Sequence, residues 1–402
     1  MKEAVKLISL FVLLSIGFSC KTNSDSTGYL KKVLNNLEKI ESATYFSTSE
    51  NWQHGDTVAM SVFCILVKEY NNPLDTTIGA SFVNLDCEEP TKLEFAYDGK
   101  IRAITYHERK GIVVDDFTAR ALPYRPLTPP FFNYTKNILH YALTTGDSIT
   151  IELKEFNDHY YFKLVINEDK QVEFFGKAHY MPDNPYNWGE TTSIYELWIS
   201  KSNNLPYKVR REMSHDISVV SCSNVELNKL SIDDFNIYEY FPADYEIRAY
   251  RVTNGERKES SLTGGKAPDW VLNDKNERSV SLSDFKGKVS LIQFTGIGCG
   301  PCQMSIPFLK ELKEKYNAEQ FELIAIETWV RKPHSIQNYS KRNDLNYNLI
   351  SGTDEVIKDY QTGGAAPVFF ILDKEQIIRK VILGYSEEST GKEITDALNE
   401  LL

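Results

Sequence analysis

The sequence has no excess of basic residues: 45 Lys and Arg stand against 56 Asp and Glu, for a formal net charge of −11. Because a nucleic-acid-binding surface needs a basic excess or patch, no nucleic acid partner is expected. Glycine (21) and proline (15) are too few for a collagen-like or linker-like chain. The seven histidines show no metal-ligand spacing, so neither a metal nor another cofactor is expected.

The abundant residues indicate a folded, strand-rich protein with more than one domain. At roughly 150 residues per domain, 402 residues correspond to two or three domains. Hydrophobic residues make up 42% and charged residues 25%, which excludes wholesale disorder. The 23 Tyr and 21 Phe favour strands, because aromatic side chains pack well on pleated surfaces.

Residues 1–19 are typical of a signal peptide, with two lysines before an apolar run of about 12 residues. The run is too short to span a bilayer as a helix. Small residues at 17 and 19 precede Cys20, and this pattern resembles a bacterial lipoprotein signal. The resemblance implies cleavage before Cys20, lipidation of its thiol and a tether over 20–28; a plain signal peptide is the alternative. We therefore expect a lipid-anchored protein of the bacterial cell envelope that faces the periplasm, with surface exposure as the alternative.

Of the other five cysteines, Cys299 and Cys302 form a C-x-x-C pair. An odd number remains, namely Cys64, Cys87 and Cys222. In an oxidising compartment two of them could form a structural disulfide and leave one buried thiol. The other interpretation is three buried apolar side chains. The sequence alone does not choose the pair.

Residues 29–252 are expected to form an α+β domain dominated by a large curved antiparallel sheet. Spacing of apolar residues predicts an amphipathic helix over 29–42, and a second helix is expected over 132–143. Asp98-Gly99 predicts a hairpin turn. The expected strands are 60–67, 78–84, 92–97, 101–106, 148–154, 160–166, 171–178, 192–199, 207–212 and 218–227.

This architecture is weakly similar to the LolA/LolB envelope lipoproteins. The resembling stretches are 39–45, 97–100, 195–199 and 204–208. The resemblance implies an apolar groove able to hold an acyl chain or a peptide. The alternative is a spacer or docking domain without a ligand.

Residues 253–265 are polar and contain Gly and Ser, which is typical of a linker. From 266 to 402, short strands alternate with helices, which predicts an α/β sandwich. The expected strands are 289–294, 321–328, 368–372 and 377–383, and the expected helices are 302–316, 335–342, 353–361 and 391–402.

The C-x-x-C pair lies where an apolar strand ends and an amphipathic helix begins. A thiolate rather than a thiol attacks a disulfide, and the unpaired N–H groups of a helix N-terminus stabilise that anion. Gly300 and Pro301 separate the cysteines, and Pro301 suits a first helical turn. We expect Cys299 to be the exposed attacking thiol and Cys302 the resolving thiol.

Residues 264–402 resemble the thioredoxin superfamily, and more closely its exported TlpA/ResA branch of thiol-disulfide oxidoreductases. Besides the C-x-x-C pair, the matching features are Pro307, the strand 366–373, Gly384, the segments 266–270 and 280–288, and a strand–helix insertion over 321–353. The resemblance implies a redox-active disulfide between Cys299 and Cys302. It also implies a cis peptide bond before Pro367, next to the two sulfurs, and a backbone at Ala366 that pairs with substrate.

Three positions depart from the family pattern. Gly298 replaces the tryptophan before the first cysteine, Gln293 replaces a buried acid, and Ser305 replaces a glutamate found in some TlpA-like reductases. These departures leave the proton-transfer group open, and exchange stays possible because the helix N-terminus activates Cys299. Glu327, on the adjacent strand, is the candidate, against the alternative that it is a solvated strand end.

The sequence thus predicts a membrane-anchored thiol-disulfide oxidoreductase that reduces disulfides in exported proteins and is recycled by a membrane thiol donor. One alternative is a thiol peroxidase of the peroxiredoxin type. That family needs Thr or Ser three residues before its reactive cysteine, where this chain has Gly296, and Thr295 is one residue out of register. The other alternative is a lipid- or peptide-binding lipoprotein whose thioredoxin-like domain is a docking module.

Overall fold

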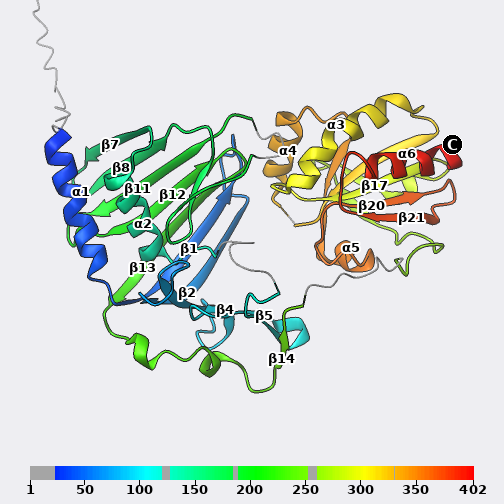
Figure 1. Cartoon of the computed structure of the whole chain (residues 1–402). Coiled ribbons are helices and arrows are strands. Elements are labelled where there is room, and N and C mark those ends of the chain that lie inside the picture. Colours follow the sequence, from blue (N-terminus) through cyan, green and yellow to red (C-terminus); the bar gives the residue numbers. More distant parts are fainter. Residues whose placement is uncertain (1–22, 120–126, 184–188, 252–259, 330) are drawn as a thin grey trace, which may run out of the picture.

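A computed structural model describes residues 23–119, 127–183, 189–251, 260–329 and 331–402 of the chain. The N-terminal part is a large sheet with two helices on one face, and the C-terminal part is a smaller sheet covered by helices (Figure 1). The predicted signal peptide, Cys20 and most of the predicted linker lie outside the described residues. No helix within the described ranges is long and apolar enough to cross a bilayer.

The N-terminal part contains a sheet of twelve strands in the order β14-β6-β5-β4-β3-β2-β1-β13-β12-β11-β8-β7. Neighbouring strands are antiparallel, except that the edge strand β14 runs parallel to β6. The strands are β1 (Ser42–Trp52), β2 (Ser61–Asn71), β3 (Ala80–Asp86), β4 (Leu93–Tyr97), β5 (Arg102–Tyr106), β6 (Gly111–Asp115), β7 (Ile149–Glu155), β8 (His159–Ile166), β11 (Ser193–Ser200), β12 (Pro206–Met213), β13 (Ile217–Leu227) and β14 (Glu246–Ala249). A separate hairpin consists of β9 (Val172–Phe174) and β10 (Ala178–Tyr180). The predicted large, mainly antiparallel sheet is therefore confirmed.

Two helices pack on this sheet, α1 (Asn23–Glu38) and α2 (Phe131–Thr144). Helix α1 begins six residues before the predicted start, so residues 23–28 are helical rather than part of a tether. The sequence could not reveal this extension, because residues 23–28 contain no apolar side chain whose spacing would mark a helix.

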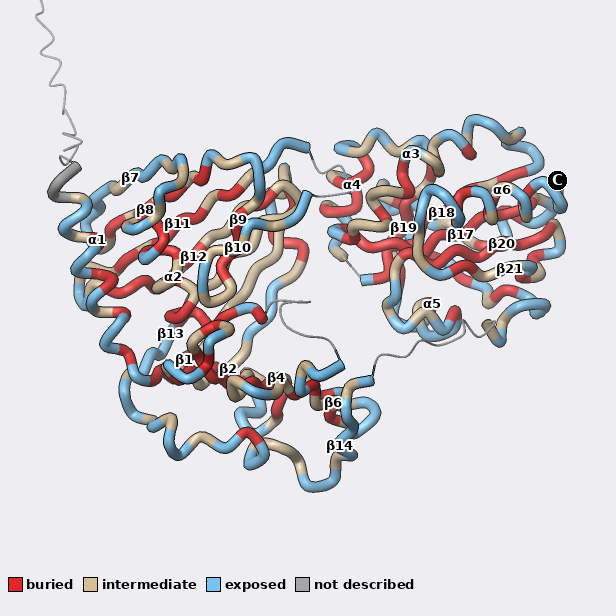
Figure 2. Tube along the Cα trace, in the orientation of Figure 1, coloured by how far each residue is buried: buried red, intermediate tan, exposed pale blue. Residues whose placement is uncertain are grey.

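The core of the N-terminal part lies between these helices and the sheet, where buried positions gather (Figure 2). It is rich in large aromatic residues. Tyr45, Phe162, Phe174 and Tyr195 are among its fully buried side chains. A cavity at the edge of this core, lined in part by Leu37, holds about 10 Å³. That volume accommodates about one water molecule.

The other cysteines pair in one of the ways that the sequence left open. The register of β2 and β3 places Ile65 opposite Asp86, and a disulfide joins the next residues along, Cys64 and Cys87. Cys222 is a buried free thiol. The interpretation of three buried apolar cysteines is wrong, because Cys64 is exposed.

The C-terminal part is built on a five-stranded sheet in the order β19-β18-β17-β20-β21. Strands β19, β18 and β17 are parallel to one another. Strand β20 is antiparallel to β17, and β21 is antiparallel to β20. The elements are β15 (Val271–Asn273), β16 (Ser279–Ser281), β17 (Val289–Thr295), α3 (Gly300–Lys315), β18 (Phe321–Glu327), α4 (Pro333–Arg342), β19 (Asn348–Ser351), α5 (Asp354–Asp359), β20 (Val368–Leu372), β21 (Ile378–Leu383) and α6 (Thr390–Leu401). Short 3-10 turns lie at 107–109, 232–234, 237–240 and 282–285.

Both faces of this sheet are buried. Leu291 of β17 packs in the cluster that includes α3, α4 and α6. Its neighbour Ile292 packs on the opposite face, with residues of α5 and of the β15–β16 hairpin. Side chains alternate between faces along a strand, so all seven residues of β17 are buried. The predicted α/β sandwich is confirmed, and its central strand leads directly to the C-x-x-C pair.

Candidate active site

The two cysteines lie at the junction of β17 and α3. Cys299 is the N-cap residue of α3, with extended backbone angles (φ −83°, ψ 116°), and Pro301 lies in the first turn. The Cys302 N–H donates to Sγ of Cys299 over 3.2 Å. This bond directs a helix N-terminal donor at the sulfur that has to carry negative charge during exchange.

Cys299 and Cys302 form a disulfide in the structure. Cys299 is 6% exposed and Cys302 is 1% exposed. Cys299 is therefore the more accessible of the two, as expected for the attacking thiol. It is nevertheless buried in this oxidised form, so the predicted exposure of Cys299 is wrong for the disulfide state.

The segment before β20 lies against the first cysteine. The Ala366–Pro367 peptide bond is cis, which confirms that expectation. The carbonyl oxygen of Ala366 lies 3.6 Å from Sγ of Cys299. The Pro367 carbonyl accepts the Gly384 N–H over 2.8 Å. The structure therefore brings together Cys299, Ala366 and Pro367, which are far apart in the sequence.

A neutral pair occupies the positions where the family pattern has acids. Nε2 of Gln293 donates to Oγ of Ser305 over 2.9 Å, and this hydroxyl donates to the Cys302 carbonyl over 2.7 Å. Both side chains are buried. They hold the first turn of α3 against β17 without supplying a titratable group.

Glu327 lies at the end of β18 and is completely buried, so the solvated-strand-end alternative is wrong. One carboxylate oxygen accepts the Ile297 N–H over 3.4 Å. The other accepts the N–H groups of Trp329 (3.1 Å) and Arg331 (2.9 Å). Burial raises the pKa of this carboxyl, although the backbone donors act in the opposite direction. Glu327 thus joins the loop before Cys299 to the loop after β18, and its role in proton transfer stays a prediction.

A polar cluster that no sequence motif revealed links α3 to α4. Oε1 of Gln303, next to Cys302, accepts the Tyr339 hydroxyl over 2.9 Å. Nε2 of Gln303 donates to Oδ1 of Asn343 over 2.7 Å. Helix α4 is therefore fixed to the first turn of the redox helix.

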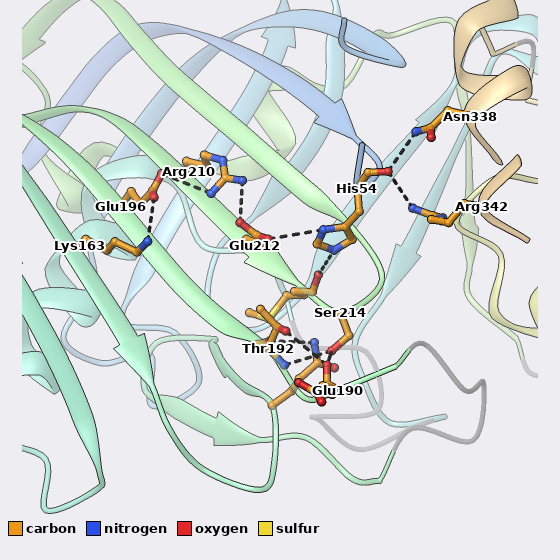
Figure 3. A network of polar contacts seen from close by, with 12 residues as sticks. His54, Lys163, Glu190, Thr192, Glu196, Arg210, Glu212, Ser214, Asn338 and Arg342 are labelled. Carbon is orange, nitrogen blue, oxygen red and sulfur yellow. Dashed lines mark hydrogen bonds and ion pairs between the residues drawn. The ribbon is translucent and has the colours of Figure 1, made fainter. Parts of the chain in front are cut away.

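Helix α4 also contacts the loop between β1 and β2 of the N-terminal part (Figure 3). Nε2 of Gln53 donates to the Ser335 carbonyl over 2.6 Å. The His54 carbonyl accepts from Nδ2 of Asn338 (3.0 Å) and from the Arg342 guanidinium (3.2 Å). These bonds dock the two parts of the chain at the helix that supports the first turn of α3.

Apolar packing reinforces the same contact. Met60, from the end of this loop, is 6% exposed and joins the core cluster that contains Ile336 of α4. The ring of His54 contacts strand β12 of the N-terminal part. Nε2 lies 2.8 Å from the Met213 carbonyl, and Nδ1 lies 3.5 Å from Oε1 of Glu212 (Figure 3).

Comparison with known proteins identifies the C-terminal part. Residues 263–381 match the AhpC/TSA family. "Thiol-disulfide oxidoreductase ResA" of Bacillus subtilis (strain 168) is 30% identical over 132 residues, which cover 33% of this chain and 73% of that protein. The protein of the same name from Bacillus thuringiensis subsp. konkukian (strain 97-27) is 30% identical over 146 residues, or 36% of this chain and 82% of that protein. The chain belongs to the ResA-like thiol-disulfide oxidoreductases.

Two solved structures each cover about a third of this chain. A thiol:disulfide interchange protein from Bacteroides sp. is 24% identical, with a TM-score of 0.30 over 34% of this chain and 90% of that chain. A thiol:disulfide interchange protein of the thioredoxin family from Chlorobium tepidum TLS is 21% identical, with a TM-score of 0.30 over 36% of this chain and 98% of that chain. As a ResA-like protein, this chain is a thiol-disulfide oxidoreductase. Each of these relatives covers 33–36% of the chain, and the similarity of the N-terminal part to LolA/LolB stays a prediction.

No group of three or more His, Cys, Asp and Glu side chains within the described ranges is arranged to hold a metal ion.

Proposed function

We propose that this chain is a membrane-anchored reductase of disulfides in exported proteins, with Cys299 as the attacking thiol and Cys302 as the resolving thiol. The observation that carries the proposal is the placement of the pair. Sγ of Cys299 accepts the Cys302 N–H over 3.2 Å at the N-terminus of a 16-residue helix. This arrangement stabilises the thiolate form of Cys299 relative to its thiol form more than the surroundings of an isolated cysteine would.

The reaction starts from the dithiol form. The Cys299 thiolate attacks one sulfur of the substrate disulfide, which forms a mixed disulfide and releases the other substrate sulfur as a thiolate that takes up a proton. The Cys302 thiol then loses its proton and attacks Sγ of Cys299, which releases the second substrate thiol. The substrate has gained two electrons and two protons, and the chain holds the Cys299–Cys302 disulfide. A membrane thiol donor must return two electrons and two protons for the next cycle.

Reduction of insulin by a regenerated dithiol form tests this assignment. We expect Cys299→Ser to reduce the rate to the uncatalysed level, because no attacking thiolate remains. Cys302→Ser should accumulate a mixed disulfide on Cys299, which non-reducing electrophoresis would detect. Cys222→Ala is the matched control and should retain the wild-type rate, since Cys222 is a buried thiol of the other domain. Unchanged insulin reduction by Cys299→Ser would contradict the proposal.

The same preparation separates this function from peroxide reduction. Gly296 gives no hydroxyl three residues before Cys299, and Thr295 is buried at the end of β17. We therefore expect the dithiol form to reduce insulin much faster than hydrogen peroxide. The opposite order would favour the peroxidase alternative.

The membrane anchor and the envelope location rest on the sequence pattern that ends at Cys20. Mass spectrometry of the protein from bacterial membranes would detect diacylglycerol on the Cys20 thiol. A Cys20→Ser variant should leave the membrane fraction. A full-length wild-type protein recovered without lipid would contradict the anchor.

For the N-terminal part we propose a docking role rather than lipid transport. Packed aromatic side chains fill the space between the sheet and its two helices, and the cavity beside Leu37 holds about 10 Å³. An acyl chain needs a far larger space than this cavity. The cavity of about 380 Å³ that His54, Thr192 and Arg342 help to line lies outside this core, and its other lining residues are also polar or charged apart from Gly189. Lipid that copurifies with the soluble protein in stoichiometric amount would support the carrier alternative instead.

A further inference from the structure

Trp329 lies next to the loop that carries Cys299, although it belongs to a different strand. Strands β17 and β18 are parallel and end together, with Thr295 opposite Glu327. The Thr328 N–H donates to the Thr295 carbonyl over 2.7 Å, which continues the pairing by one residue. Trp329 therefore leaves β18 beside the residues that lead from β17 to Cys299.

The indole of Trp329 packs directly on Gly296. A Cβ atom added at Gly296 would lie 2.6 Å from Cζ3 and 2.7 Å from Cε3 of Trp329, so only glycine leaves room for the ring. The Gly296 carbonyl in turn accepts the Cys299 N–H over 3.1 Å. The ring thus covers the turn that holds the first cysteine.

The same indole reaches the segment on the other side of Cys299. Nε1 of Trp329 donates to the Gly364 carbonyl over 3.0 Å. Gly364 lies two residues before Ala366, whose carbonyl oxygen is 3.6 Å from Sγ of Cys299. Trp329 therefore bridges the two backbone segments that flank the attacking sulfur.

Trp329 is held firmly yet remains accessible. Its N–H donates to Glu327, and the Arg331 guanidinium lies 5.5 Å from the ring centroid. The side chain is 37% exposed, whereas Cys299 is 6% exposed. Because Nε1 already donates to Gly364, the remaining ring atoms, all carbon, offer an apolar surface. A rigid, partly exposed aromatic ring gives a large contact area at a low cost in entropy.

We propose that Trp329 is a specificity-determining residue that contacts the polypeptide substrate and favours an apolar side chain next to the attacked cysteine. A substrate that brings its sulfur to Cys299 must approach the rim to which the indole belongs. Packing an apolar side chain on the ring removes both surfaces from water. This inference rests on the proposed disulfide reductase function and adds the substrate class to it.

Two disulfide-bridged peptides that differ only in Leu or Ser before the first cysteine provide the test. The dithiol form of the soluble chain, from residue 21 onward, should reduce the Leu peptide with a kcat/KM about tenfold above that of the Ser peptide. In Trp329→Ala we expect that ratio to fall to within about twofold of one. Reduction of bis(2-hydroxyethyl) disulfide, which has no polypeptide to contact the ring, measures in each variant the loss of rate that comes from the loop alone, and the peptide ratio is independent of that loss. Trp198→Ala, which removes a tryptophan from β11 in the other domain, is the matched control and should keep the full ratio.

Two further variants keep the test decisive if Trp329→Ala disturbs the loop. Trp329→Phe keeps an aromatic ring but loses the bond to Gly364, and it should retain most of the preference for the Leu peptide. Gly296→Ala keeps the tryptophan but displaces its ring, and it should lose the preference. A wild-type protein without preference, or a Trp329→Ala variant with the wild-type ratio, would overturn the inference. Failure of the wild type to reduce bis(2-hydroxyethyl) disulfide would instead overturn the proposed function.

Discussion

At the scale of single residues, the N-terminal part contains a buried carboxyl group of its own, that of Glu69. Glu69 accepts the N–H groups of Phe132 (3.2 Å) and Asn133 (2.7 Å) at the start of α2, and the Tyr45 hydroxyl over 2.9 Å. Burial raises the pKa of this carboxyl to about 7, and the effect of burial exceeds that of the three donors. Glu69 therefore fixes α2 to the sheet, and its contribution to the free energy of unfolding depends on pH.

We expect the N-terminal domain to lose stability as the pH rises from about 4.5 to 7. Because the pKa of Glu69 is higher in the folded than in the unfolded state, the folded protein holds an extra proton in this window. The loss should be about 3 kcal/mol, and Glu69→Gln should flatten the dependence. Urea unfolding of this domain can be followed separately, since Cys222 is a buried free thiol that reacts with a pyridyl disulfide reagent once exposed. Glu226→Gln, at an exposed site on β13, is the control, and identical pH profiles for Glu69→Gln and wild type would contradict this prediction.

Single residues also differ in whether the sequence alone could identify their role. The C-x-x-C pair and Pro367 could be identified because a family pattern fixes them at known spacings. The partners Cys64 and Cys87 could not, because they depend on the register between β2 and β3. Trp329 carries no motif, and its position beside Cys299 results from the parallel pairing of two strands.

At the scale of elements, α4 is the contact between the redox helix and the N-terminal domain. Tyr339 of α4 binds Gln303 on the first turn of α3. The same helix contacts the loop between β1 and β2, and Met60 of that loop is buried in the core of the C-terminal domain. Movement of the N-terminal domain should therefore displace the first turn of the redox helix.

Met60→Ala should loosen α4 without unfolding either domain. Removing a buried methionine side chain costs about 2–5 kcal/mol where neighbours cannot fill the space, and this loss falls on the docking contact. Hydrogen–deuterium exchange of the amides in 333–342 should accelerate by at least about tenfold. Leu74→Ala is the control, since Leu74 is 90% exposed in a loop of the same domain. Unchanged exchange in α4 would show that this contact does not hold the helix.

Elements differed in how well the sequence predicted them. Strand β17 and helix α3 were recognised because one is a continuous apolar run and the other an amphipathic segment. Strand β1 (Ser42–Trp52) was missed, although it lies between β2 and β13 near the middle of the sheet. Its residues are mostly Ser, Thr, Glu and Asn, so the apolar signal is weak. Its pairing with β13 joins residues 165 to 184 positions apart, from Trp52–Ile217 to Ala43–Leu227, and no local pattern encodes such a distance.

At the scale of the whole molecule, a ResA-like domain is joined to a large sheet domain with a filled core. The two contact each other through α4, on the side of the C-terminal domain that faces the sheet (Figure 1). Composition and the change from strands to alternating elements were sufficient to predict two domains of these classes. The contact between them could not be predicted, because Gln53, His54 and Met60, which make it, lie in a loop without a motif.

The reduction potential of the Cys299–Cys302 couple tests the central claim most directly. It can be measured in the soluble protein from residue 21 onward by equilibration with thiol buffers and quantification of the Cys299 thiol. A disulfide reductase supplied with electrons at the membrane should have a reduction potential of about −270 mV, in the range of thioredoxin. A reduction potential of about −120 mV would contradict the reductase function and indicate an enzyme that introduces disulfides. A pair that cannot be reduced and reoxidised at all would contradict the catalytic role of the two cysteines.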